Sequence, residues 1–194
     1  MKVIQIKVVV FITALIPLIW LGYGALSETL GANPIETITR TLGDWALRFL
    51  LITLTVTPLR KFTGWGWPMR LRRMLGLYAF FYALLHLSSY IVLDQFFYWP
   101  EIWADIVKRP YITIGMINFL LLIPLAITST NKWMRRLGKN WLRLHKLIYP
   151  IAIGAVVHYL LLAKVITAEP LVYAVLTTLL LLSRLPRFSL STRQ

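Results

Sequence analysis

The chain has 194 residues, of which 58% are hydrophobic, and a formal net charge of +14. It contains no cysteine, which excludes disulfides, cysteine-ligated zinc, iron–sulfur clusters and covalent cofactor attachment through C-x-x-C-H. On a soluble chain such a basic balance would suggest nucleic acid. Here the basic residues lie between apolar runs of membrane length, so we expect no nucleic-acid partner and predict an integral protein embedded in membrane lipid.

Six apolar spans follow one another, and no soluble domain, long linker or internal repeat is evident. We expect them at about residues 8–26, 44–60, 74–94, 111–130, 144–164 and 167–184. The first is longer than the apolar region of a typical signal peptide, and we interpret it as a retained span. Because lipid requires closed backbone hydrogen bonding, residues 1–194 are expected to form a single all-α domain, a six-helix transmembrane bundle.

Charge is segregated between alternate connections of the predicted bundle. The N-terminus, the loop after the second span, the stretch after the fourth span and the C-terminus carry Lys and Arg but no acid. The acids fall in the other connections: Glu28, Glu36, Asp44, Asp94, Glu101, Asp105 and Glu169. The positive-inside rule then places both termini in the cytoplasm, as expected for a multi-pass protein of a bacterial inner membrane.

The three histidines are almost the whole inventory of strong metal ligands. His86 lies about twelve residues into the third span, which at about 1.5 Å per residue is roughly 18 Å from its cytoplasmic end. His158 lies at a similar depth in the fifth span, whereas His145 lies near the cytoplasmic end of that span. Polar groups inside a membrane are costly and mostly functional, so the depth-matched pair is a candidate site.

Three interpretations of the pair are open. Each neutral imidazole could be bonded to a nearby Ser, Thr or backbone carbonyl, with Ser88 and Ser89 close to His86. A bare metal ion held by two imidazoles would lack ligands, because no thiol or carboxylate is expected at that depth. A haem supplies four nitrogens in its plane and needs only two axial imidazoles. Without cysteines it would be a non-covalent haem b, with His86 and His158 as iron ligands.

A second site is expected nearer the cytoplasm, so the number of haems is one or two. Arg72 precedes His86 by fourteen residues, about 40° short of whole helical turns, and lies on the same helix face. It could pair with a haem propionate or a phosphate, act as an unusual ligand, or simply set topology. His145 lies about 140° from His158 on a straight helix, unless Pro150 and Gly154 kink it. We take His145 as a ligand or a residue of the electron path.

Four stretches together resemble the MsrQ family of haem-binding membrane subunits of periplasmic methionine sulfoxide reductase systems. They are LGANPIETITRTLGDWALRFLLITLTVTPLR, RRMLGLYAFFYALLHLSSY, KRPYITIGMINFLLLIPLAITST and LGKNWLRLHKLIYPIAIGAVVHYLLLAK. The resemblance covers nearly the whole chain and extends to ferric reductase-like transmembrane domains. In this resemblance His86, His145 and His158 match haem-ligand positions, whereas Arg72 stands where the wider superfamily often has a histidine.

The resemblance implies a function that residue spacing does not supply. Electrons from the quinone pool or a cytoplasmic flavin reductase would cross the inner membrane to a periplasmic MsrP-type molybdoprotein, which reduces methionine sulfoxide and so repairs oxidised proteins. FMN is a second implied cofactor. The chain has no G-x-G-x-x-G fingerprint, so we expect a redox subunit without a substrate-reducing site of its own.

Two other functions fit parts of the pattern. A stand-alone metal reductase would use the same chemistry to reduce ferric ions at the outer face. A transporter would use buried histidines to carry protons or metal ions, but transporters tend to show internal repeats and interrupted helices.

Overall fold

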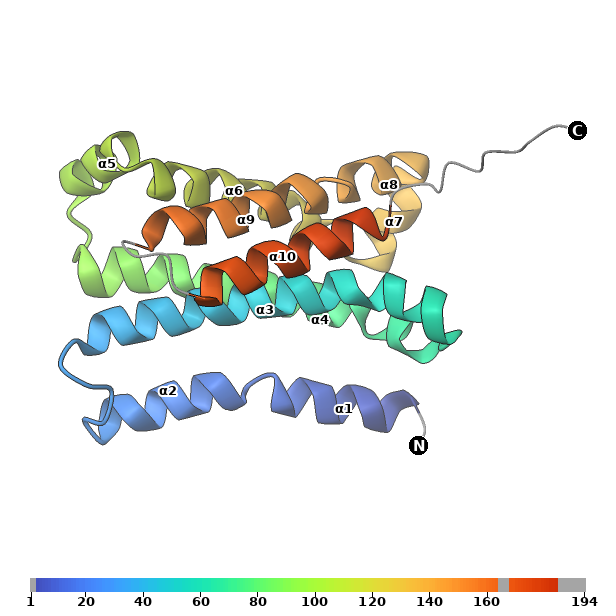
Figure 1. Ribbon diagram of the computed structural model, residues 1–194, viewed down its shortest axis with the longest axis horizontal. Coiled ribbons are helices and arrows are strands. Elements are labelled where there is room, and N and C mark those ends of the chain that lie inside the picture. The colour runs from blue at the N-terminus through green and yellow to red at the C-terminus, as the bar shows by residue number, and fades with distance from the viewer. Residues whose placement is uncertain (1–2, 164–167, 185–194) are drawn as a thin grey trace, which may run out of the picture.

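The computed structural model describes residues 3–163 and 168–184, which form helices joined by short connections (Figure 1). The helices are α1 (Val3–Thr13), α2 (Ile16–Leu26), α3 (Pro34–Thr63), η1 (Trp67–Arg70), α4 (Arg72–Ser89), the π-helical η2 (Tyr90–Asp94), α5 (Trp99–Lys108), α6 (Pro110–Ile127), α7 (Asn131–Leu137), α8 (Lys139–His145), α9 (Ile148–Leu162) and α10 (Ala168–Leu182). Residues 164 and 167, at predicted span ends, lie outside the described residues.

The predicted class, a helical multi-pass membrane protein, is confirmed. Five segments are long and apolar enough to cross a membrane: Ile4–Leu26, Pro34–Thr63, Arg72–Asp94, Pro110–Ile127 and Lys139–Leu162. The helix α10 has 15 residues, about 22 Å against a hydrocarbon core of about 30 Å, so a sixth span remains a prediction.

The second span was predicted at residues 44–60, but the helix there is longer and spans Pro34–Thr63. The helix α3 begins at Pro34, because Asn33 accepts a hydrogen bond from the Glu36 amide and Pro34 occupies the first turn, where its missing N–H costs nothing. It ends at Thr63, where Gly64 adopts the left-handed conformation with φ 75°. The short helix α5, between η2 and α6, was not predicted.

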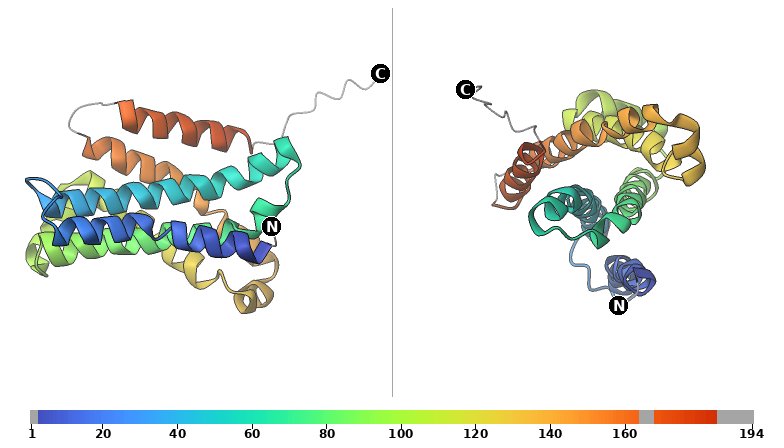
Figure 2. Two further views of the ribbon diagram at one scale, coloured as in Figure 1. Left: turned by 90° about the horizontal axis from the view of Figure 1, so that it is seen from below. Right: turned by 90° about the vertical axis from the view of Figure 1, so that its right-hand side faces the viewer.

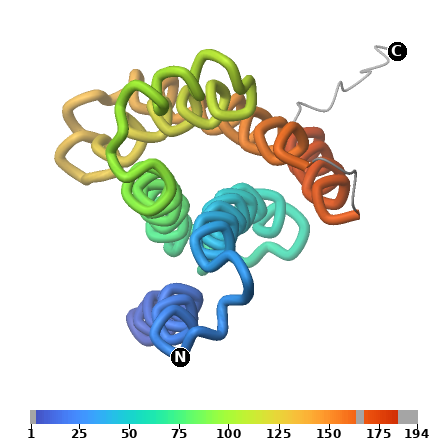
Figure 3. Tube along the Cα trace, turned by 90° about the vertical axis from the view of Figure 1, so that its left-hand side faces the viewer, coloured from blue at the N-terminus to red at the C-terminus, as the bar shows by residue number. Residues whose placement is uncertain are grey.

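Two antiparallel helix pairs form the centre of the bundle. The helix α3 packs along α4, α6 packs along α9, and α10 lies against both α9 and α3. Figure 3 and the right-hand view of Figure 2 look along the bundle from its two ends and show α1 and α2 covering α3 and α4 on the side away from α6 and α9. Phe49 stacks between Tyr78 and Tyr82, with ring centroids 5.4 Å apart in each pair, and so joins α3 to α4.

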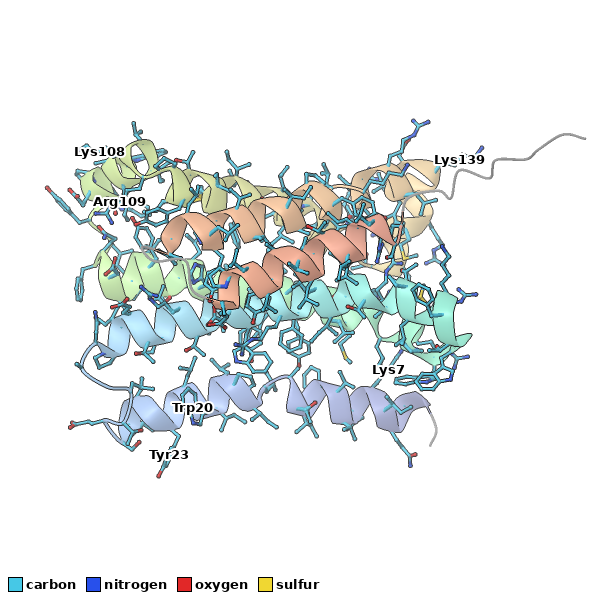
Figure 4. All side chains as sticks on the ribbon, viewed as in Figure 1. Lys7, Trp20, Tyr23, Lys108, Arg109 and Lys139 are labelled. Atoms are coloured by element: carbon cyan, nitrogen blue, oxygen red, sulfur yellow. The ribbon has the colours of Figure 1, made fainter. Side chains whose placement is uncertain are left out.

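The acidic residues lie mainly at the α5 end of the bundle. Figure 4 shows Lys7 and Lys139 toward the other end, whereas Lys108 and Arg109 are basic residues at the α5 end. Six of the seven acids, all except Asp44, lie in connections or short helices or first turns at the α5 end. The beginning of α1 and the end of α10 both lie at the opposite end, on different sides of the bundle (Figure 1). The cytoplasmic placement of this end remains a prediction.

The break between α1 and α2 is stabilised by two tyrosines of α4. Pro17 has no N–H to continue the helix, so carbonyl groups near the break lose their usual partners. The Tyr78 hydroxyl donates to the Phe11 carbonyl at 2.9 Å, and the Tyr82 hydroxyl donates to the Ala14 carbonyl at 2.7 Å. These two hydrogen bonds attach the first span to the central pair.

We expect Tyr82→Phe to destabilise the protein by about 1–3 kcal/mol, because it leaves the buried Ala14 carbonyl without a donor. A lower unfolding temperature in detergent would measure the loss. Tyr23→Phe is the control, since the Tyr23 side chain is exposed. Equal unfolding temperatures for the two variants would contradict this role for Tyr82.

Candidate cofactor site

His86 and His158 project into one cavity between the two helix pairs. His86 lies near the end of α4 and His158 near the end of α9, so both lie in the half of the bundle that faces α5. Their ring centroids are 6.2 Å apart, and the ring planes are inclined at 82°. Both residues line a cavity of about 620 Å³, a volume within the usual range of ligand sites. The structure thus brings together the two histidines that the sequence paired by depth.

Each of the two imidazoles is oriented by a backbone carbonyl of the partner helix. The Nδ1 of His86 donates to the Thr39 carbonyl at 2.8 Å, and the Nδ1 of His158 donates to the Tyr111 carbonyl at 2.6 Å. A carbonyl can only accept, so the ring proton lies on Nδ1. A neutral imidazole in this tautomer keeps its lone pair on Nε2, the arrangement of a metal-binding histidine.

Two glycines make these contacts sterically feasible. A Cβ atom added at Gly43 would lie 3.0 Å from the Nδ1 of His86, and one added at Gly115 would lie 2.9 Å from the Nδ1 of His158. Gly43 follows Thr39 by four residues, and Gly115 follows Tyr111 by four. Each glycine therefore leaves open the flank of its helix where the imidazole reaches the carbonyl one turn earlier.

The two halves of this arrangement repeat each other, although sequence analysis detected no repeat. Each histidine bonds to the carbonyl of the residue 47 positions earlier. The stretches TRTLG and YITIG, residues 39–43 and 111–115, share Thr, an aliphatic residue and Gly in their last three positions. That short match was the available signal for Thr39, Gly43, Tyr111 and Gly115, which sequence reasoning missed.

The outer mouth of the cavity is polar. Arg109, between α5 and α6, pairs with the buried Asp105 at 3.0 Å, and Asp105 also accepts a hydrogen bond from Tyr90 at 3.0 Å. A hydrogen bond to Tyr111 raises the pKa of Arg109 above its ordinary value, so the guanidinium stays charged. Arg40, on α3, is the other arginine that lines the cavity. Arg40 pairs with Glu36 at 2.6 Å, so each of the two arginines has a carboxylate partner at the mouth of the cavity.

The deeper end of the cavity contains a buried carboxamide. Asn118, on α6, is 8% exposed, and its Nδ2 has no partner among the described residues. A Cβ atom added at Gly154 would lie only 2.5 Å from the Asn118 Oδ1, so the carboxamide occupies the space that a larger residue would need. Gly154 therefore makes room for Asn118 one turn before His158.

The remaining two predicted site residues do not reach this cavity. The Nε2 of His145 lies 3.1 Å from the Thr128 hydroxyl, and its ring stacks on Trp141 with centroids 4.0 Å apart. The helix breaks at Lys146 and Leu147, between α8 and α9, one turn before Pro150, which has no N–H to bond to the Lys146 carbonyl. The structure also places Arg72 away from the cavity, at the first residue of α4.

The histidine pair suits a planar metal cofactor better than a bare ion. Among the described residues, no group of three or more His, Cys, Asp or Glu is placed to hold a metal ion. Two imidazoles alone leave a metal ion short of ligands. Imidazoles bound through Nε2 on opposite sides of one metal, each at about 2 Å, have ring centroids about 6 Å apart, close to the separation observed. Fold and site together define a multi-pass helical membrane protein with a paired-histidine cofactor cavity.

Comparison with known proteins places the chain in a family. Residues 42–156 match the family described as ferric reductase like transmembrane component. The "Protein-methionine-sulfoxide reductase heme-binding subunit MsrQ" of Rhodospirillum rubrum is 56% identical over 180 residues, covering 92% of this chain and 86% of the relative. The protein of the same name from Xanthomonas euvesicatoria pv. vesicatoria is 52% identical over 186 residues, covering 93% and 85%. No solved structure gives a significant match. The chain belongs to the MsrQ family.

We expect Gly154→Ala to destabilise the protein by about 1–3 kcal/mol, because the added methyl group overlaps the Asn118 carboxamide. Adding Asn118→Ala to Gly154→Ala should recover part of the lost stability. Unfolding temperatures of the two single variants and the double variant measure this coupling. Gly22→Ala, where a Cβ atom meets nothing within 4 Å, is the matched control. Strictly additive effects of the two substitutions would show that the residues do not interact.

Proposed function

We propose that this chain is the haem b-binding electron-transfer subunit of a methionine sulfoxide reductase system. One observation carries the proposal: two imidazoles, each held by a carbonyl through Nδ1, line a shared cavity with 6.2 Å between ring centroids. The relatives are named heme-binding subunits. A haem b in this cavity would supply a carrier for single electrons.

The chain's own residues bind and orient the cofactor. His86 and His158 would hold the haem iron, and the Thr39 and Tyr111 carbonyls keep both rings in the tautomer that leaves Nε2 unprotonated. Apolar side chains such as Leu50, Leu122 and Ile151 line the cavity beside the two histidines. Arg40 and Arg109, at the polar mouth, are placed to hold propionate groups.

The position of the cavity supports transfer toward the outer face. Its lining includes Glu36, Asp94 and Arg109, all at the α5 end of the bundle, where a periplasmic partner would approach. That partner is an MsrP-type molybdoprotein, and the acidic outer segments with Asp94, Glu101 and Asp105 would assist a transient contact. Electrons enter from the quinone pool or a cytoplasmic flavin reductase at the basic end.

The second part of the proposal concerns His145 and Arg72, at the inner end of the bundle. His145 and Arg72 lie within electrostatic range of each other near the start of α9 and α4. They are placed on the path between the cytoplasmic face and the paired histidines, where a second haem or FMN would shorten the electron transfer. The relatives' names mention heme alone, and FMN is the second cofactor of this proposal.

An absorption spectrum of the purified protein, oxidised and then reduced with dithionite, tests the haem assignment directly. We expect a b-type spectrum, and a pyridine haemochrome assay should give one or two haems per chain. His86→Ala and His158→Ala should each abolish the haem between these residues. Normal haem content in either variant would refute the paired-ligand arrangement. If the protein is colourless although haem is ample during expression, the transporter function is favoured instead. If the protein reduces ferric chelates without a partner protein, the stand-alone metal reductase function is favoured.

Gly43→Ala and Gly115→Ala should each lower haem content several-fold while leaving both histidines in place. The added methyl group would lie about 3 Å from an imidazole nitrogen and push the ring away from its carbonyl. Gly76→Ala on α4 is the control, because its nearest added contact is an ordinary 3.7 Å from Thr53. Unchanged haem content and spectrum in both variants would contradict the role given to the two glycines.

A further inference from the structure

The short helix α5 lies at the level where two membrane spans end. It follows the span Arg72–Asp94 and precedes the span Pro110–Ile127. Figure 3, in which the α5 end faces the viewer, shows it at the edge of the molecule, and it packs against α6. The preceding span has 23 residues, about 34 Å of helix against a hydrocarbon core of about 30 Å. The helix α5 therefore begins near the boundary between hydrocarbon and headgroups.

One side of α5 is apolar and exposed. Trp99, Trp103 and Val107 are 54%, 65% and 81% exposed. At about 100° per residue, these three side chains lie within about 80° of one another around the helix. Ile102 and Asp105 are buried and form a separate sector, which faces the rest of the protein. Packing against the bundle thus fixes the rotation of α5 and leaves its large apolar side chains outside.

The charged side chains of α5 lie opposite its exposed apolar side. Glu101 and Lys108 are both exposed, and they lie about 140–160° from Trp103 around the helix. Because the bundle fixes the rotation, the apolar and charged sides face different media. Charged side chains need water, and a charge directed into lipid is costly. The side with Trp103 therefore faces the membrane when the charged side faces water.

The connection before α5 adds two exposed aromatic rings. Phe96 and Phe97 are both exposed, and both adopt the left-handed backbone conformation, with φ 44° and 59°. This conformation costs free energy for bulky residues, and rings directed into water do not offset that cost. Aromatic side chains are favoured at the interface between lipid and water, so contact with lipid would stabilise this turn.

We propose that α5 lies along the membrane interface, with its aromatic face embedded between the lipid headgroups and the upper acyl chains. The aromatic face consists of Phe96, Phe97, Trp99, Trp103 and Val107. Amphipathic helices of this kind bury their apolar side about 5–10 Å into the interface. A protein partner seated on the aromatic face is the alternative occupant, but Glu101 and Lys108 would then point toward the lipid.

This contact also sets the level of the cavity mouth relative to the membrane. Asp105, on the buried side of α5, accepts a hydrogen bond from Tyr90 and pairs with Arg109, and both partners line the cavity of the paired histidines. A helix held in the interface by its aromatic face therefore holds the mouth at the depth of the headgroups. The inference does not depend on which cofactor the cavity binds.

The test measures the depth of single nitroxide labels on α5. The sequence contains no cysteine, so each variant carries one label on an otherwise unchanged chain. Trp103→Cys and Val107→Cys report on the aromatic face, and Glu101→Cys and Lys108→Cys are the matched controls on the charged side of the same helix. In lipid nanodiscs, power-saturation electron paramagnetic resonance compares collisions with oxygen, which concentrates in lipid, and with a water-soluble nickel chelate.

We expect an oxygen-to-nickel collision ratio several-fold higher at positions 103 and 107 than at positions 101 and 108. Equal ratios at all four positions would overturn the proposal. Access of nickel to positions 103 and 107 that is lost only when a molybdoprotein partner is added would also overturn it, and would identify a protein-docking face. Val107→Cys reports on the aromatic face if Trp103→Cys fails to fold.

Discussion

The arrangement of the site depends on the contact between an imidazole Nδ1 and a backbone carbonyl of a neighbouring helix. A helix carbonyl already accepts one bond from the residue four positions later, and it can accept another only if its flank is open. Gly43 and Gly115 provide that opening, and His86 and His158 use it. The same contact fixes tautomer, ring orientation and helix spacing, so both ligands are prepared before any cofactor binds.

Prolines supply a second constraint, which the fold meets with side chains from distant segments. Near Pro17, the freed carbonyls accept hydrogen bonds from Tyr78 and Tyr82. Opposite Pro58, the freed Leu54 carbonyl accepts one from Arg184. Lipid offers no water to these groups, so each interruption of a span requires an internal donor. The donors attach α1 and α10 to the central pairs, which is why the outer helices keep their place.

Charge divides the molecule into two functional ends. Carboxylates and the cavity mouth with Arg109 lie at one end, and Arg72 and His145 lie at the other. In the proposed relay, donor and acceptor bind on opposite faces, and the two ends of the bundle differ accordingly in charge. His145 does not share the cavity of the other two histidines: the break at Lys146 and Leu147 directs it to Thr128 and Trp141.

Local sequence properties determined the membrane class, the charge asymmetry and the equal depth of His86 and His158, because hydropathy, charge and rise per residue can be counted along one segment. Sequence did not predict α5 or the early start of α3, whose apolar pattern is weaker. Only tertiary structure decided that the two rings share a cavity, that Thr39 and Tyr111 orient them, and that Arg184 reaches the Leu54 carbonyl. Those contacts depend on the rotation and packing of helices far apart in sequence, which no single segment encodes.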